Sequence, residues 1–134
     1  MAASYSAEVN YETGLVNPEY QAWLEDTLTR LEHFGHNVFC ALRVDQYKIN
    51  NAGPAEAFRL DEEEIEKAYG LFAIVTDRPS TGVQTEIGIA IRAGKTIIIA
   101  HLPQHPLAYF NNAIIRAGKA TELVLPITED PFAI

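Results

Sequence analysis

Apolar residues recur along this chain in two patterns, one typical of buried strands and one typical of the helices that cover them. Continuous apolar runs predict strands at 37–44, 71–77, 95–102 and 122–127, and a short further strand at 1–5. Apolar residues at helical spacing predict helices at about 17–35, 54–69, 82–93 and 106–117. The polar, turn-rich stretch 6–17 is expected to be a loop.

Strands that are apolar throughout are buried on both faces, which is typical of a parallel sheet covered by helices on both sides. We therefore expect one domain over residues 1–134, a doubly wound five-stranded parallel sheet of flavodoxin-like (Rossmann-like) order in a three-layer α/β sandwich. Ligands of such sheets bind beyond the carboxyl ends of the strands, where loops lead into helices. The stretch "DRPSTG" (77–82) occupies such a place.

Composition narrows the classes of function. The length of 134 residues, 48% of them apolar, suits one domain with a core, and the net charge of −8 opposes binding to a nucleic acid polymer or an anionic membrane. A single cysteine, Cys40, excludes a disulfide framework and is expected to be an inert core thiol. Neither a signal peptide nor a membrane-spanning run of roughly 20 apolar residues is recognised, so a soluble, cytoplasmic protein is expected.

Glu86 is an unusual acid because it borders the apolar stripe of the predicted helix 82–93. An acid in a first turn often only complements the helix dipole. Here Thr81 and Gln84 form an expected capping box, which leaves Glu86 without a capping role. From the local pattern, a structural and a functional role are equally well supported.

Asp61 is a second acid in an unexpected place. The helical period puts it within the apolar stripe of the predicted helix 54–69, and this helix leads into the strand before "DRPSTG". A half-exposed position at the start of a buried face would also explain it. Two carboxyl groups in unequal environments are the usual means of cleaving a glycosidic bond.

The segments "RLDEEEIEKA" (59–68) and "PSTGVQTEIGIAIRAGK" (79–95) resemble the N-glycosidases of nucleoside 5′-monophosphates, within the nucleoside 2-deoxyribosyltransferase-like superfamily. The similarity is greatest to the hydrolases of CMP and hydroxymethyl-CMP, and somewhat less to the deoxynucleoside-monophosphate N-glycosidases. It covers nearly the whole chain, and its "PSxGxxxEIG" core is its most specific part.

The resemblance implies roles for the two acids. Glu86 matches the nucleophile that attacks C1′ of the sugar and forms a covalent glycosyl-enzyme. Asp61 matches the acid that assists departure of the base or orients the sugar, with Glu62 and Glu64 as alternatives for that position.

The resemblance also implies binding residues. Tyr5 matches an aromatic residue that lines the sugar and the nucleophile, flanked by Ser4 and Ser6 in the first-strand loop. Ser80 and Gly82 match a phosphate-binding turn, where a hydroxyl and free backbone N–H groups complement an oxyanion.

Three further positions concern the phosphate and the assembly. Arg43 and Arg78 are candidates for added positive charge near the phosphate. Nucleoside transferases carry an aspartate where this chain has Ser80, and a carboxylate there would repel a phosphate, which favours nucleoside monophosphates as substrates. Asn112 matches a position that the family donates across a homodimer interface.

The expected function is hydrolysis of the N-glycosidic bond of a nucleoside 5′-monophosphate, with a pyrimidine, CMP-like substrate. A base-exchanging transferase and a non-catalytic nucleotide-binding module are the alternatives, and the sequence leaves the base and the choice of ribose or deoxyribose open. No cofactor and no metal are expected, because Pro103 prevents helical pairing of His101 and His105 and the nucleotide-binding glycine motifs are missing.

Overall fold

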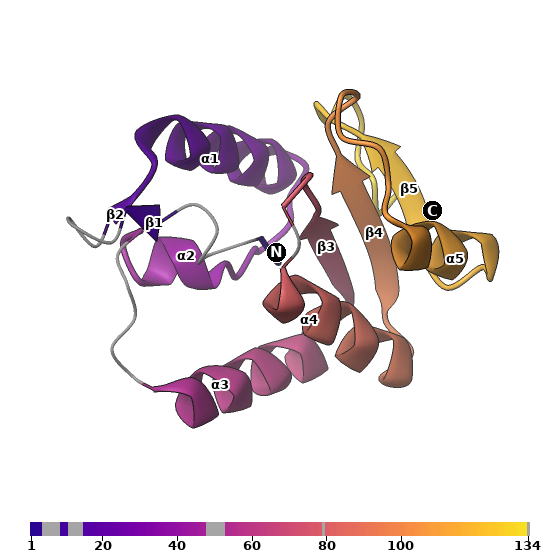
Figure 1. Ribbon diagram of the computed structural model, residues 1–134, viewed down its shortest axis with the longest axis horizontal. Helices are drawn as coiled ribbons and strands as arrows, with labels where there is room; N and C mark the ends of the chain where they lie inside the picture. Colours follow the sequence, from indigo (N-terminus) through magenta and orange to yellow (C-terminus); the bar gives the residue numbers. More distant parts are fainter. Residues whose placement is uncertain (4–8, 11–14, 48–52, 79, 134) are drawn as a thin grey trace.

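The computed structural model describes residues 1–3, 9–10, 15–47, 53–78 and 80–133. Its elements in chain order are β1 (Val9–Asn10), β2 (Leu15–Val16), α1 (Pro18–His33), α2 (Ala41–Val44), α3 (Pro54–Lys67), β3 (Gly70–Ile74), α4 (Thr81–Arg92), β4 (Thr96–His101), α5 (Tyr109–Arg116) and β5 (Thr121–Val124) (Figure 1). Helices α1, α3, α4 and α5 and strands β3, β4 and β5 overlap the ranges that the apolar pattern predicts.

The central sheet has the order β3-β4-β5 and all its strand pairs are parallel. At the β3 edge a single parallel bridge joins Ala2 to Ala73. The predicted parallel α/β architecture is therefore confirmed. The sheet formed by the described residues has three strands, so the expected five strands in flavodoxin-like order are not established.

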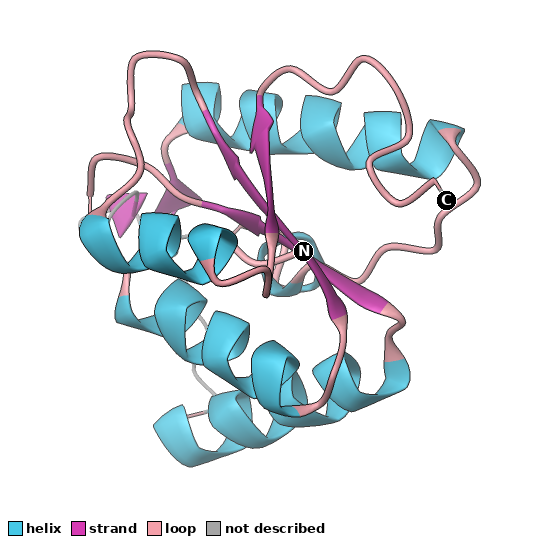
Figure 2. Ribbon diagram, turned by 90° about the vertical axis from the view of Figure 1, so that its right-hand side faces the viewer, coloured by secondary structure: helices cyan, strands magenta, loops and turns pink. Residues whose placement is uncertain are grey.

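Helices cover both faces of this sheet (Figures 1 and 2). On one face α1 buries Leu24, Leu28 and Leu31 against strand residues such as Phe72 and Ile98. On the other face α4 packs against the sheet. The core there is formed by Val83, Ile87 and Ala90 of α4 and by strand residues Leu71, Ala73, Ile97 and Ile99. Consecutive strand residues point to opposite faces, so a run that is apolar throughout serves both cores.

The start of α1 follows from its first residues. The side chain of Asn17 accepts hydrogen bonds from the backbone N–H groups of Glu19, at 2.9 Å, and Tyr20, at 3.4 Å, and Pro18 occupies the first turn. These contacts satisfy N–H groups that a helix start leaves without partners. Asn17 is therefore the N-cap of the helix expected at about 17–35.

Two predicted segments differ from the structure. The strand expected at 37–44 is wrong: residues 36–40 have no regular structure and the helical turn α2 follows. A short apolar run cannot be distinguished by periodicity from one buried turn of helix, and here Leu42 alone in α2 is buried. The loop expected at 6–17 is also wrong in part, since β1 and β2 form a short antiparallel pair.

Candidate active site

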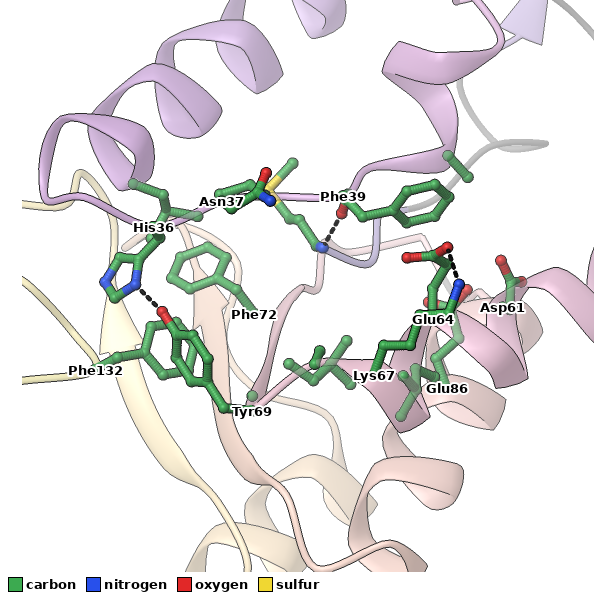
Figure 3. A pocket seen from close by; sticks show the side chains of 18 residues that line it. His36, Asn37, Phe39, Asp61, Glu64, Lys67, Tyr69, Phe72, Glu86 and Phe132 are labelled. Carbon is green, nitrogen blue, oxygen red and sulfur yellow. Dashed lines mark hydrogen bonds and ion pairs between the residues drawn. The ribbon is translucent and has the colours of Figure 1, made fainter.

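A cavity of about 550 Å³ lies between α3, α4 and the outer edge of β3 (Figure 3). Its lining differs from one end to the other. One end carries the ionisable side chains of Asp61, Glu64, Lys67 and Glu86, which come from α3 and α4. The other end is lined by aromatic rings, namely those of His36, Tyr69, Phe72 and Phe132. We call these the carboxyl end and the aromatic end.

Helix α4 places Glu86 at the carboxyl end. The helix begins after Ser80, whose Oγ accepts a hydrogen bond from the N–H of Val83 at 3.3 Å. The cap is therefore Ser80, and the capping box expected from Thr81 is wrong. Val83 and Ile87 are buried in the core, and Glu86, between them on the helix, is half-buried beside this face.

Helix α3 brings Asp61 to the same end of the cavity. Ile65 is its buried residue, and Asp61 and Glu64, four and one positions earlier, lie on the neighbouring side of the helix and line the cavity. Glu62 is exposed and is not among the lining residues. Asp61 and Glu64 therefore remain candidates for the second acid, whereas Glu62 is exposed to solvent outside the cavity.

The two acids share a site that disfavours a second negative charge. The pKa of Glu86 is raised to about 8, mainly by burial and in addition by its interaction with the carboxyl group of Asp61. A carboxyl group in a poorly solvated site beside another acid retains its proton to a higher pH. At neutral pH Glu86 therefore retains its proton.

Met1 is among the residues that line the cavity. Its amino group donates a hydrogen bond to the C=O of Phe39 at 2.6 Å. Its positive charge opposes the rise of the Glu86 pKa, and burial lowers the pKa of the Met1 amino group itself. No pattern in the sequence pointed to this contact, because it depends on how the chain start packs against residues 36–40.

The predicted phosphate-binding turn is at the start of α4. Ser80 is half-buried and Gly82 is exposed, and neither lines the cavity itself. The start of α4 and Glu86 are separated by six residues, about 9 Å along the helix axis. The positive end of the helix dipole and its first N–H groups point toward Ser80.

Arg43 and Asn112 lie away from the cavity. Arg43 is in α2, where its guanidinium bonds Glu25 at 3.1 Å and Glu32 at 3.0 Å, both in α1. Asn112 is exposed on α5, two positions after the exposed Phe110. Within one chain, therefore, neither side chain reaches the carboxyl end of the cavity.

The three residues expected in the first-strand loop, Ser4, Tyr5 and Ser6, lie outside the described residues.

The sequence analysis did not predict the aromatic end of the cavity. His36 is hydrogen-bonded to Tyr69 and, at 2.7 Å, to Asp130, and its ring packs edge-on against Phe132. Residues so far apart in the sequence give no spacing signal, so only the tertiary structure could reveal this end.

Two kinds of feature are missing from the described part of the chain. No group of three or more His, Cys, Asp or Glu side chains is arranged there to hold a metal ion. In the same residues, no helix has the length and apolar character needed to cross a membrane.

Comparison with known proteins supports the fold. No family model matches the chain, and no match is found among curated proteins. Among solved structures, the CMP N-glycosidase BcmB of Clostridium botulinum has a similar fold, with a TM-score of 0.61, 22% sequence identity and 80% of each chain covered. At this identity the likeness shows the fold, a parallel α/β sheet with flanking helices, and the chemistry has to be argued from the site.

Proposed function

We propose that the protein hydrolyses the N-glycosidic bond of a nucleoside 5′-monophosphate, with CMP as the best candidate, to give the free base and the sugar 5-phosphate. The observation that carries this proposal is the pairing of Asp61 and Glu86 at one end of a cavity, with the pKa of Glu86 raised to about 8. The shared fold with a CMP N-glycosidase supports the same substrate class.

The reaction starts from the proton that Glu86 retains. The proton moves to Asp61, and the Glu86 carboxylate attacks C1′ while the bond from C1′ to the base nitrogen breaks. The electron pair of that bond goes to the base, which takes the proton from Asp61. Water then attacks C1′ of the glycosyl ester, gives a proton to Asp61, and releases the Glu86 carboxylate and the sugar 5-phosphate.

The start of α4 is the proposed site for the 5′-phosphate. The Ser80 hydroxyl accepts from Val83 N–H and retains its own hydrogen for donation to a phosphate oxygen. The backbone at Gly82 carries no Cβ, and the nearest heavy atom to a Cβ placed there would be Ser80 Oγ at 3.9 Å. A ligand oxygen can therefore approach this turn closely.

The deciding experiment is chromatography of a panel of nucleotides after incubation with the protein. The panel contains the 5′-monophosphates of cytidine, deoxycytidine, uridine and adenosine, and cytidine itself. Release of free cytosine from CMP, absent with the variant Glu86→Gln, is the expected result. Incorporation of labelled free cytosine into CMP would instead identify a transferase, and saturable binding of CMP without release of base would identify a nucleotide-binding module.

A further inference from the structure

His101 is a buried histidine at the carboxyl end of β4. Its side chain is 7% exposed and lies on the sheet face that α4 covers, because Ile99, two positions earlier, belongs to the core of that face. Glu122 of β5 lies on the same face, since it is paired in register with Ile99. The reaction proposed above does not use His101 or Glu122, so their pairing needs another explanation.

Both ring nitrogens of His101 face oxygen acceptors. Nδ1 lies 2.9 Å from the backbone C=O of Leu102, and Nε2 lies 2.6 Å from a carboxylate oxygen of Glu122. A neutral imidazole carries one N–H group, whereas an imidazolium carries two. Only the imidazolium can donate to both oxygens. The geometry therefore favours the charged ring.

The surroundings of the ring act in the same direction. Burial by itself lowers the pKa of His101. The hydrogen bond to Glu122 and the backbone at Leu102 and His105 outweigh burial, so the pKa of the ring is raised above its ordinary value of 6.5. Glu122 is the charged group among these causes. His105 is the next titratable group along the chain, and its Nε2 lies 3.8 Å from a carboxylate oxygen of Asp77, which follows β3.

His101 holds two segments that follow neighbouring strands. Its backbone C=O accepts a hydrogen bond from the N–H of Leu125, directly after β5, at 2.8 Å. Its ring bonds Leu102, the first residue of the connection 102–108, which leads into α5. Within this connection the N–H of His105 donates to the same C=O of Leu102 at 3.0 Å. The ring of His101 thus ties the first turn of the connection to Glu122 of β5.

We propose that the His101–Glu122 pair is a pH-sensitive latch that fixes the connection 102–108, and with it the start of α5, to the edge of the sheet. Loss of the ring proton leaves one N–H group for two acceptors, so a lone pair of the ring then faces either the Glu122 carboxylate or the C=O of Leu102. The buried ring has little access to water that could replace the lost bond. The latch therefore opens as pH rises through the pKa of His101.

The contribution of this latch to stability has a defined sign. Because folding raises the pKa of His101, the contribution is complete below the ordinary value of 6.5 and is lost as pH rises through the folded-state pKa. Glu86 loses its own contribution in the same direction, as pH rises through about 8. The test therefore uses local readouts, and it is repeated in the variant Glu86→Gln.

NMR spectroscopy of the ring tests its charge. Long-range ¹H–¹⁵N spectra should show both His101 ring nitrogens protonated at pH 6.0 and a titration midpoint above 6.5. Glu122→Gln keeps an oxygen acceptor but removes its charge, so this variant should lower the midpoint. Glu129→Gln, an exposed acid beyond β5, is the matched control and should leave the midpoint unchanged. A midpoint at or below 6.5, or an unchanged midpoint in Glu122→Gln, would overturn the latch.

Amide hydrogen exchange tests whether the ring holds the connection. The protection factor of the His105 amide, corrected for the intrinsic effect of pH on exchange, should fall at least about tenfold between pH 6.5 and 9.5. The amide of Val75, which donates to the C=O of Ala100 at 2.9 Å on the other side of β4, is the internal control and should keep its protection. In Glu122→Gln the fall should occur at lower pH.

The variant His101→Gln separates the latch from other titrations. Its side chain does not titrate, so the fall in His105 protection should be absent. A fall that persists in His101→Gln, or constant protection of the His105 amide in the unmodified protein, would overturn the proposal. The latch and the proposed hydrolysis can fail separately, because neither His101 nor Glu122 is among the residues that line the cavity.

Discussion

The side chains of Asp61 and Glu86, from the two different helices α3 and α4, line the same end of the cavity, and the Asp61 carboxyl group adds to the effect of burial in raising the pKa of Glu86. The pair is half-buried at one end of the cavity, and the pKa of Glu86 rises to about 8 as a result. Glu86 therefore retains its proton at neutral pH. It leads to the first three predictions below.

Replacement of Glu86 by glutamine should abolish turnover without unfolding the protein. Glutamine has nearly the same shape but cannot form the glycosyl ester, so kcat on CMP should fall by at least about a thousandfold. The matched control is Glu62→Gln, an exposed acid on α3 outside the cavity, which should keep normal kcat. Turnover of Glu86→Gln within tenfold of the unmodified protein would contradict the mechanism.

The pH dependence of activity distinguishes the two roles of Asp61. If Asp61 delivers the shared proton to the base, kcat/KM should fall as pH rises through about 8, where the pair loses that proton. Rates on CMP between pH 6.5 and 9.5 would show this limb. A kcat/KM that rises through pH 8 would mean that Asp61 only orients the sugar and that Glu86 alone has to ionise.

Stability should also depend on pH through Glu86. Its folded-state pKa of about 8 lies above the usual value of 4.5, so its stabilising contribution is complete below about pH 4.5 and is lost as pH rises through about 8. Because the side chain is only half-buried, we expect a loss of about 2 kcal/mol in the free energy of unfolding. Urea denaturation of Glu86→Gln, measured at the same pH values, should not show this loss in the free energy of unfolding. The same dependence of unfolding free energy on pH in both proteins would be evidence against the raised pKa.

Replacement of Ser80 by aspartate tests the phosphate site. Aspartate caps a helix as well as serine does, so the bond to the Val83 N–H and the fold should persist. Its charge would repel a phosphate, and the ratio of kcat/KM for CMP to that for cytidine should fall at least about a hundredfold, or roughly 2.7 kcal/mol. Thr81→Asp, an exposed neighbour, serves as the charge control. Equal losses for both substrates would show that Ser80 is structural.

We propose that the active unit is a homodimer that places Asn112 near the partner's site. Tyr109 and Phe110 on α5 are 83% and 69% exposed, an unusual exposure for aromatic rings. Phe110→Lys should therefore give a monomer with reduced activity in light scattering and CMP assays, whereas Phe58→Lys, on the exposed side of α3, should not. A fully active monomer of the unmodified protein would refute this assembly.

The sequence by itself determined the helices and inner strands that hold the site. The apolar runs of β3 and β4 and the spacing of Val83, Ile87 and Ala90 in α4 require burial, and burial follows from local pattern. The same spacing marked Glu86 and Asp61 as acids beside buried faces. Patterns of this kind predict structure because each apolar side chain favours burial by itself, whatever segment it later packs against.

Only the tertiary structure decided how the elements meet. The turn α2 stands where a strand was predicted, and there Arg43 pairs with Glu25 and Glu32 of α1, contacts that no local pattern contains. The aromatic end joins His36 to Phe132 across most of the chain. The pKa of Glu86 likewise depends on Asp61 from another helix. Charge interactions and cavities arise between segments, so their energies are set by packing and cannot be deduced from the order of residues within one segment.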